Sequence, residues 1–295
     1  MQKIFFILIG FFSCLIVQNC TAQKKISDQL PDSLAGKRFC FYYDFRVGDT
    51  LIYHAFSRDS MVYDDFPTLS KERNETWRYV IEKKMPNNRV LISIEMIGYA
   101  AQESQGSLRN QMRLNSVWTG RKVFVEMDST GKRYSLAAID SITPAVAPGG
   151  AFQPIVLANI GETCMRGKDA WVVGGEENLI ENGIPVPLVN YSSLARFTGL
   201  IDTLGVACYG MQFTTTGQGI SEVSFGNGHD KTASVSSVIN QFTKMELSKV
   251  YHIPVHAMAT AEIKFTLTYP NGKKTKGIQH ILTHYTLRNY RFDKQ

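Results

Sequence analysis

Apolar residues recur at every second position over several long stretches, and this period constrains the fold of the chain more than any other feature. Trp77, Tyr79 and Ile81 alternate with residues that include Arg78 and Glu82, and residues 90–96 and 263–269 show the same period. Successive side chains of a β-strand point to opposite faces, so the pattern predicts strands with one buried and one wet face. Such strands are typical of antiparallel sheets. We therefore expect a mainly β protein of antiparallel sheets, a half-barrel or a sandwich, with few short helices.

Turn residues separate these stretches. Residues 86–88, 129–132 and 270–273 read Pro-Asn-Asn, Ser-Thr-Gly-Lys and Pro-Asn-Gly-Lys, which is hairpin chemistry. The best helix candidate is residues 234–250, where the spacing of the apolar residues is moderately helical.

A passage rich in proline and glycine, residues 143–154, divides the chain near its middle. It predicts an N-terminal β unit over residues 23–142 and a C-terminal β unit over residues 155–295. Gly-Asp-Thr at residues 48–50 and Gly-Glu-Thr at residues 161–163 open the two halves alike, and Gly-Lys turns follow late strands in both. These matches suggest two diverged β units, although turn chemistry also produces such matches by chance.

Residues 1–22 have the features of a secretory signal peptide. Lys3 precedes an apolar run over residues 4–17, and Thr21 and Ala22 form a small-residue exit. The run is short for a membrane span and polar residues follow it at once, which argues against an uncleaved anchor. Lipidation at Cys20 is disfavoured because Gln18 and Asn19 do not fit a lipobox. We expect a periplasmic or outer-surface protein that is soluble after cleavage behind Ala22.

Cleavage would leave Cys40, Cys164 and Cys208 in an oxidising compartment. Cys164 and Cys208 lie in the same predicted unit, so one expectation is a disulfide between them with Cys40 as a buried thiol. The alternative is three buried free thiols that pack as small apolar residues.

No motif indicates a metal, a cofactor or a catalytic centre. His252 with His256 and His280 with His284 have a spacing that suits a metal on a helix, but residues four apart on a strand lie about 13 Å apart. The glycine-rich segments do not open a helix as phosphate-binding loops do, and no nucleophile elbow is present. An enzyme, such as a hydrolase with no recognisable motif, is therefore the third choice of function.

Positive charge gathers near the C-terminus of a chain whose formal net charge is +6. Lys273, Lys274, Lys276 and Arg288 are expected to contact anionic groups of lipids or glycans. Lysines also protect an edge hairpin against pairing with other sheets, which is the competing interpretation. The predicted compartment argues against nucleic acid as a partner.

Six of the thirteen aspartates precede Ser or Thr and then an aliphatic residue, Met or Thr. This pattern resembles the O-glycosylation sequon of exported Bacteroidota proteins. The resemblance implies acceptors at Ser33, Thr50, Ser60, Ser129, Ser141 and Thr203. Asp-Ser and Asp-Thr also favour turns in their own right.

With its Thr-Ala-Gln signal exit and its Gly-Asp-Thr start, the chain resembles uncharacterised secreted β-rich proteins of the same phylum. In layout it is more loosely similar to lipoprotein-carrier half-barrels, whose curved sheet holds acyl chains, and this resemblance transfers no functional residue.

The first functional hypothesis is a non-catalytic cell-envelope binding or carrier protein that holds an apolar or amphiphilic ligand, such as a lipid, on a concave sheet. The inward residues that would line this sheet are Trp77, Tyr79, Val90, Ile92 and Ile94. The same residues are equally well explained as an ordinary core. The second hypothesis is a structural or adhesive surface component that contacts an envelope protein or glycan. The oligomeric state stays open.

Overall fold

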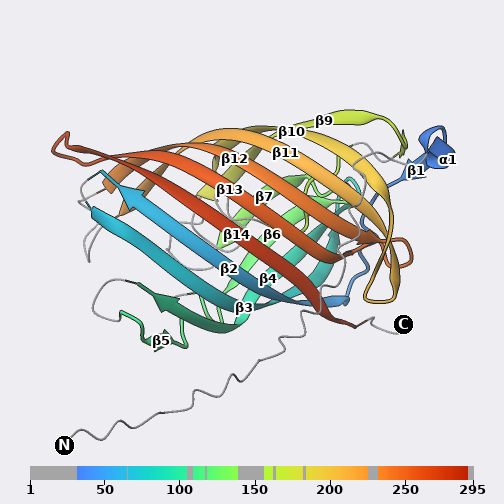
Figure 1. Cartoon of the computed structure of the whole chain (residues 1–295), viewed down its shortest axis with the longest axis horizontal. Helices are drawn as coiled ribbons and strands as arrows, with labels where there is room; N and C mark the ends of the chain where they lie inside the picture. Colours follow the sequence, from blue (N-terminus) through green and yellow to red (C-terminus); the bar gives the residue numbers. More distant parts are fainter. Residues whose placement is uncertain are drawn as a thin grey trace, which may run out of the picture.

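The computed structural model describes residues 32–64, 66–104, 109–116, 118–138, 156–161, 164–181, 184–224 and 232–291. One short helix, α1 (Asp32–Ala35), precedes the strands (Figure 1). The strands are β1 (Arg38–Cys40), β2 (Thr50–Tyr63), β3 (Phe66–Met85), β4 (Arg89–Glu103), β5 (Met112–Arg113), β6 (Lys122–Asp128), β7 (Arg133–Ala138), β8 (Cys164–Arg166), β9 (Ala170–Glu181), β10 (Ile184–Thr203), β11 (Val206–Ser224), β12 (Thr232–Ser248), β13 (Pro254–Thr268) and β14 (Lys274–Arg291). No helix within the described ranges is long and apolar enough to cross a membrane.

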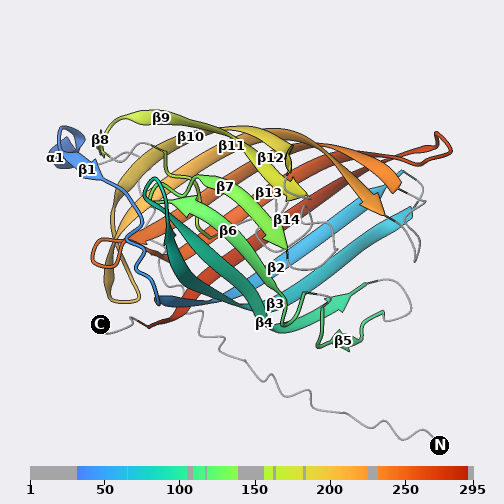
Figure 2. The ribbon, with the colours of Figure 1, turned by 180° about the vertical axis from the view of Figure 1, so that it is seen from behind.

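Twelve of these strands form one open antiparallel sheet in the order β7-β6-β4-β3-β2-β14-β13-β12-β11-β10-β9, with β5 added beside β4. The sheet curls so strongly that its edge strands, β7 and β9, come close together without forming a ladder in the described ranges (Figures 1 and 2). The last strand, β14, pairs with the first long strand, β2, along most of its length. Strands from both predicted units therefore belong to the same sheet, and the predicted connection at residues 143–154 lies outside the described residues.

The inward face of the curled sheet is buried and largely apolar. Along β2, Leu51, Tyr53 and Ala55 are buried while the residues between them are half-buried, and β3 and β4 bury Trp77, Tyr79, Ile81 and Ile92 in the same core. Alternate burial of this kind is what the sequence period predicts.

Two irregular segments pack against this buried face of the sheet. The first follows β1 and carries Phe41 and Tyr43. The second, residues 156–161, precedes β8 and carries Leu157 and Ile160. All four side chains are buried. Their polar groups are satisfied: the Tyr43 hydroxyl donates to the Ala158 carbonyl at 2.8 Å, and the Trp171 Nε1–H donates to the Ile160 carbonyl at 2.6 Å. Burial raises the pKa of Tyr43 far above its usual value.

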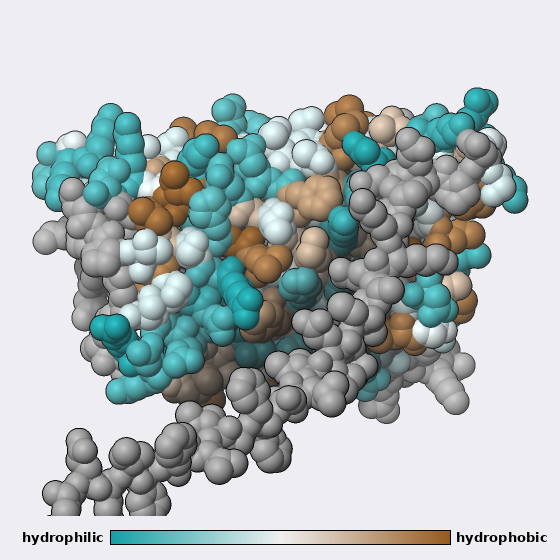
Figure 3. All heavy atoms as spheres, viewed as in Figure 1, coloured by the Kyte–Doolittle hydropathy of each residue, from teal (hydrophilic) through white to brown (hydrophobic). Residues whose placement is uncertain are grey.

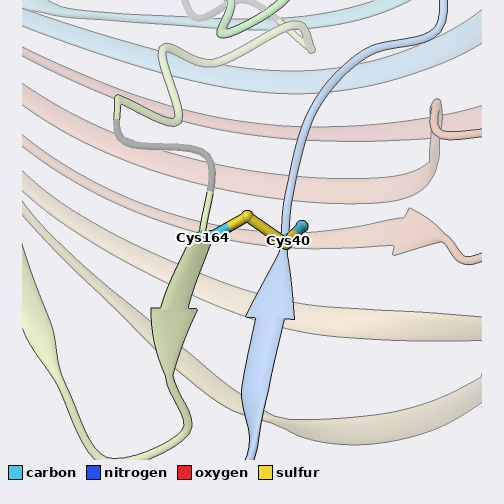
Figure 4. Close-up of a disulfide and its surroundings, with 2 residues drawn as sticks. All are labelled: Cys40 and Cys164. Carbon is cyan, nitrogen blue, oxygen red and sulfur yellow. A yellow bond between two sulfur atoms is a disulfide. The ribbon is translucent and has the colours of Figure 1, made fainter.

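The disulfide joins Cys40 to Cys164, so the predicted pairing of Cys164 with Cys208 is wrong (Figure 4). β1 and β8 form a separate two-stranded ladder in which Cys40 lies opposite Cys164, with Cα atoms 4.0 Å apart. Cys208 is a buried free thiol on β11, and burial raises its pKa to about 11. The expectation went wrong because the disulfide connects the two predicted units instead of lying within one.

The strand predictions are confirmed, and the best helix candidate, residues 234–250, is mostly strand. That stretch is β12, which pairs with β11 on one side and β13 on the other. Ile239, Thr243, Met245 and Leu247 are buried at odd positions, as in a strand. The predicted turns are present: Asn87 and Asn88 have φ of 61° and 58°, and Gly131 and Gly272 have φ of 82° and 80°.

Candidate functional site: a groove on the exposed face

Two neighbouring rows of side chains cross the exposed face of the sheet. The first row crosses seven adjacent strands, β4, β3, β2, β14, β13, β12 and β11, and the second crosses six of them, from β3 to β11. The strand register places Arg58 opposite Leu282, Leu282 opposite Thr260, and Thr260 opposite Phe242 in the first row. In the second row Ser60 lies opposite His280, His280 opposite Glu262, and Glu262 opposite Asn240. Paired residues of an antiparallel sheet point to the same face, so each row is continuous.

A groove of about 910 Å³ lies between and over these two rows. It also touches the one row between them, whose side chains, such as Ile281 and Ala261, point to the buried face. Because two complete outward rows and one inward row line it, we place the groove on the exposed face, with the backbone of the inward row as its floor. Figure 3 looks onto this face, where hydrophobic patches break an otherwise hydrophilic surface. The outward lining is Arg58, Ser60, Ser70, Glu72, Gln102, Thr214, Thr216, Asn240, Phe242, Thr260, Glu262, His280 and Leu282.

The groove combines an apolar centre with hydroxyl, amide and charged side chains around it. Half-buried Phe242 and Leu282 flank Thr260 in one row, and their apolar surface faces the groove. Arg58 and Glu72 form an ion pair at 2.8 Å, but both side chains are more than half exposed, so the pair adds little stability. Such a lining offers apolar contact together with many donors and acceptors, and it suits an amphiphilic ligand.

Beneath the groove, the buried face carries a cluster of paired charges. Arg73 contacts Asp59 at 2.9 Å and Glu75 at 2.8 Å, and the Trp77 Nε1–H donates to Glu75 at 3.1 Å. Burial raises the pKa of Asp59 and of Glu75, while Arg73 acts in the opposite direction on both. Each charge has a partner, as buried charges require, so the cluster is explained as structure.

Three histidines and two glutamates lie on the exposed faces of β12, β13 and β14. The rings of His256 and His284 lie 6.2 Å apart, and His256 Nδ1 is 3.5 Å from Glu246. Burial lowers the pKa of His284, and nearby His256 lowers it further. His256 and His284 belong to different H-x-x-x-H pairs of the sequence. The pairing of β13 with β14 brings them together, and their spacing in the sequence does not predict this contact. No group of three metal-ligating residues occurs within the described part of the chain.

One row contains the residue types of a hydrolase triad but not its contacts. Ser60, His280 and Glu262 are consecutive in register, and His280 Nδ1 lies 4.0 Å from Glu262. No hydrogen bond joins Ser60 to His280, both of which are described. A nucleophile needs a base within hydrogen-bond reach, so the row does not support catalysis as it stands.

The five predicted ligand-binding residues lie in the packed core rather than around an open concavity. Trp77 and Tyr79 on β3, and Val90, Ile92 and Ile94 on β4, are all at most 7% exposed. The space beside Tyr79, Ile92 and Ile94 is about 10 Å³, which is roughly the room of one water molecule. Their role in binding stays a prediction, and a ligand there would have to displace the segment that carries Leu157.

The predicted anion-contacting residues fall at two places. Lys273, Lys274 and Lys276 are exposed at the hairpin between β13 and β14, whereas Arg288 is exposed near the other end of β14. Twelve residues separate Lys276 from Arg288, which is about 40 Å along a strand. One ligand group cannot contact both places.

Of the predicted glycan acceptors, Ser33 is exposed in α1, and Thr50, Ser60, Ser129 and Thr203 are half-buried. Thr203 donates to Glu246 at 2.7 Å. Ser141 lies outside the described residues. Glycosylation remains a prediction for all six.

Comparison with known proteins gives no family. No family model matches the chain, and no curated protein matches it. Solved structures with partial likeness include DynF from the dynemicin biosynthesis pathway of Micromonospora chersina, at 8% identity over 88% of this chain and 90% of that one, with a TM-score of 0.27. OpdQ of Pseudomonas aeruginosa is 7% identical over 83% of this chain and 100% of that chain, with a TM-score of 0.23. An outer membrane protein of Vibrio cholerae, OmpT lacking loop L8, is 9% identical over 81% and 100%, with a TM-score of 0.20. Likenesses at these TM-scores carry no argument about function.

Proposed function

We propose that the protein is a non-catalytic binding protein of the cell envelope that holds an amphiphilic ligand in the groove on the exposed face of its sheet. The observation that carries the proposal is the groove itself, with about 910 Å³ of space and an apolar centre at Phe242 and Leu282. This volume lies in the range of small-molecule sites. The predicted signal peptide at residues 1–22 supports the compartment, and the disulfide fits an oxidising one.

The test is to purify the mature protein from its native envelope without denaturant and to compare its native mass with its denatured mass. Loss of one small-molecule mass on denaturation supports the proposal and identifies the ligand. Identical masses would reject it.

Matched variants show whether the ligand lies in the groove. Thr260 is exposed on β13 in the middle of the groove, so Thr260→Trp should fill the site without disturbing the core. Leu200→Trp makes a similar change on β10, where Leu200 is 46% exposed and does not line the groove. The mass difference should disappear in the first variant and persist in the second. Persistence in both would place the ligand elsewhere.

The filled interior favours a second candidate, a structural or adhesive surface component. Phe41, Tyr43 and Leu157 occupy the space that an interior carrier would keep open. This candidate predicts identical native and denatured masses together with retention of the protein on whole envelopes.

A further inference from the structure

A second hollow lies on the same exposed face, next to the groove and toward the hairpin between β13 and β14. It measures about 610 Å³. One row of its lining runs from Val62 to Ile278, Lys264 and Val238 across β2, β14, β13 and β12. Val62, Ile278 and Val238 are 43%, 37% and 48% exposed. Three aliphatic side chains therefore face solvent around one lysine.

Two lysines of this hollow are available to an anion. Lys264 Nζ lies 3.1 Å from Glu262, but this pair is exposed and weak. Lys276 enters the lining from the next row, opposite Thr266. Asp64 accepts a hydrogen bond from the backbone N–H of Lys276 at 3.0 Å. Among the described residues, the Lys276 ammonium forms no ion pair. Lys273 and Lys274 are exposed on the same hairpin and add positive charge.

We propose that the hollow binds the acidic head of the ligand, so that the ligand is a single-chain anionic amphiphile. The inference rests on the proposed function: the apolar chain runs along β14 from Leu282 in the groove, past His280, to Ile278 in the hollow. The carboxylate or phosphate then lies between Lys264 and Lys276. Leu282 and Lys276 are six residues apart on one strand, which is about 20 Å. Aliphatic surface beside lysines matches such a ligand in both shape and charge.

The experiment is calorimetric titration of the mature protein with dodecanoate and with dodecyl maltoside, each below its micelle concentration. The two probes share an alkyl chain and differ in head charge. In the double variant Lys264→Gln/Lys276→Gln, dodecanoate should bind about tenfold more weakly, since two exposed charge contacts are lost. Binding of dodecyl maltoside should change less than twofold. Added salt should weaken dodecanoate binding to the wild type.

The matched control is Lys83→Gln/Lys84→Gln, which removes the same charge from two exposed lysines of β3 outside the hollow. It should leave dodecanoate affinity unchanged. Equal weakening in both double variants would overturn the inference, because net charge alone would then explain it. Unchanged dodecanoate affinity in Lys264→Gln/Lys276→Gln would also overturn it.

Two further results separate this inference from the proposed function. If Thr260→Trp abolishes binding of both probes while the lysine variant changes neither affinity, the groove binds amphiphiles and the assignment of the acidic head is wrong. If the wild type binds neither probe and shows no mass difference between its native and denatured forms after purification from the envelope, the proposed function itself fails.

A third experiment uses phosphatidylglycerol vesicles. If Lys264→Gln/Lys276→Gln loses vesicle binding without losing dodecanoate binding, the lysines contact a membrane surface and the inference is overturned.

Discussion

Removal of the disulfide should cost a large part of the stability of this protein. The bond connects residues 124 positions apart, so it closes a loop of about 125 residues in the unfolded chain. The chain-entropy relation gives a loss of about 16 cal/mol/K for such a loop, or about 5 kcal/mol at 25 °C. Folded domains are typically stable by about 5–15 kcal/mol, so the double variant Cys40→Ser/Cys164→Ser should lose about a third or more of its unfolding free energy.

Urea unfolding followed by circular dichroism measures this change. The urea concentration at the midpoint of unfolding should fall. The dependence of the unfolding free energy on urea concentration, the m-value, should rise because the unfolded chain without the bond is more extended. Cys40 is exposed and the two strands pair over three residues only, so the substitution itself removes little native packing. Dithiothreitol should reproduce the loss in the wild type and have no effect on the double variant.

A loss below about 1 kcal/mol would refute the reasoning, since the unfolded chain would then gain little freedom from breaking the bond. A loss of unfolding free energy well above about 5 kcal/mol with an unchanged m-value would also refute the reasoning. That result would mean that the bond holds Phe41 and Tyr43 in the core rather than restricting the unfolded chain.

Three further predictions concern the sheet and its interior. Gly277→Val should destabilise the protein by about 1–3 kcal/mol, because even a Cβ at this position would come within 2.3 Å of the Phe265 ring; Gly36→Ala, with open space around it, should change stability by less than about 0.5 kcal/mol in the same urea assay. Tyr43→Phe should cost about 1–3 kcal/mol, because the Ala158 carbonyl loses its donor, whereas exposed Tyr42→Phe should be neutral; equal effects would contradict the role of this hydrogen bond. Burial raises the folded-state pKa of Glu75, so its contribution to stability is fully present below its usual pKa near 4.5 and is lost as the pH rises through the folded value. The unfolding free energy of the wild type relative to Glu75→Gln should therefore fall as the pH rises above about 4.5. A difference that does not change with pH would show that Glu75 takes up no proton on folding.

The sequence predicts the strands well because their signal is local. The alternation over residues 263–269 and the asparagines at residues 87–88 act through neighbouring residues, and both match the structure. The stretch at residues 234–250 is the best helix candidate because its apolar residues fit a helical spacing moderately well, but two neighbouring strands decide its conformation. Local propensity does not contain that information.

The candidate site was out of reach of the sequence for a different reason. Phe242, Thr260 and Leu282 form one row only because β12, β13 and β14 pair in a particular register. Arg58 pairs with Leu282, which lies 224 positions later in the chain. The same holds for Cys40 and Cys164 and for the segments around Tyr43 and Leu157, which are irregular and show no period. Long-range pairing set by the whole fold decides these contacts.

The pairing of β14 with β2 has a consequence for biogenesis. Until the last strand has been made, β2 has β3 on one side and an unpaired row of backbone groups on the other. Such an edge invites pairing with another chain. The sheet can therefore be completed only after the ribosome has synthesised residues 274–291, and a chain truncated before β14 would present two open edges at the middle of its sheet. Folding of the chain therefore requires that β2 be kept from other strands until residues 274–291 arrive.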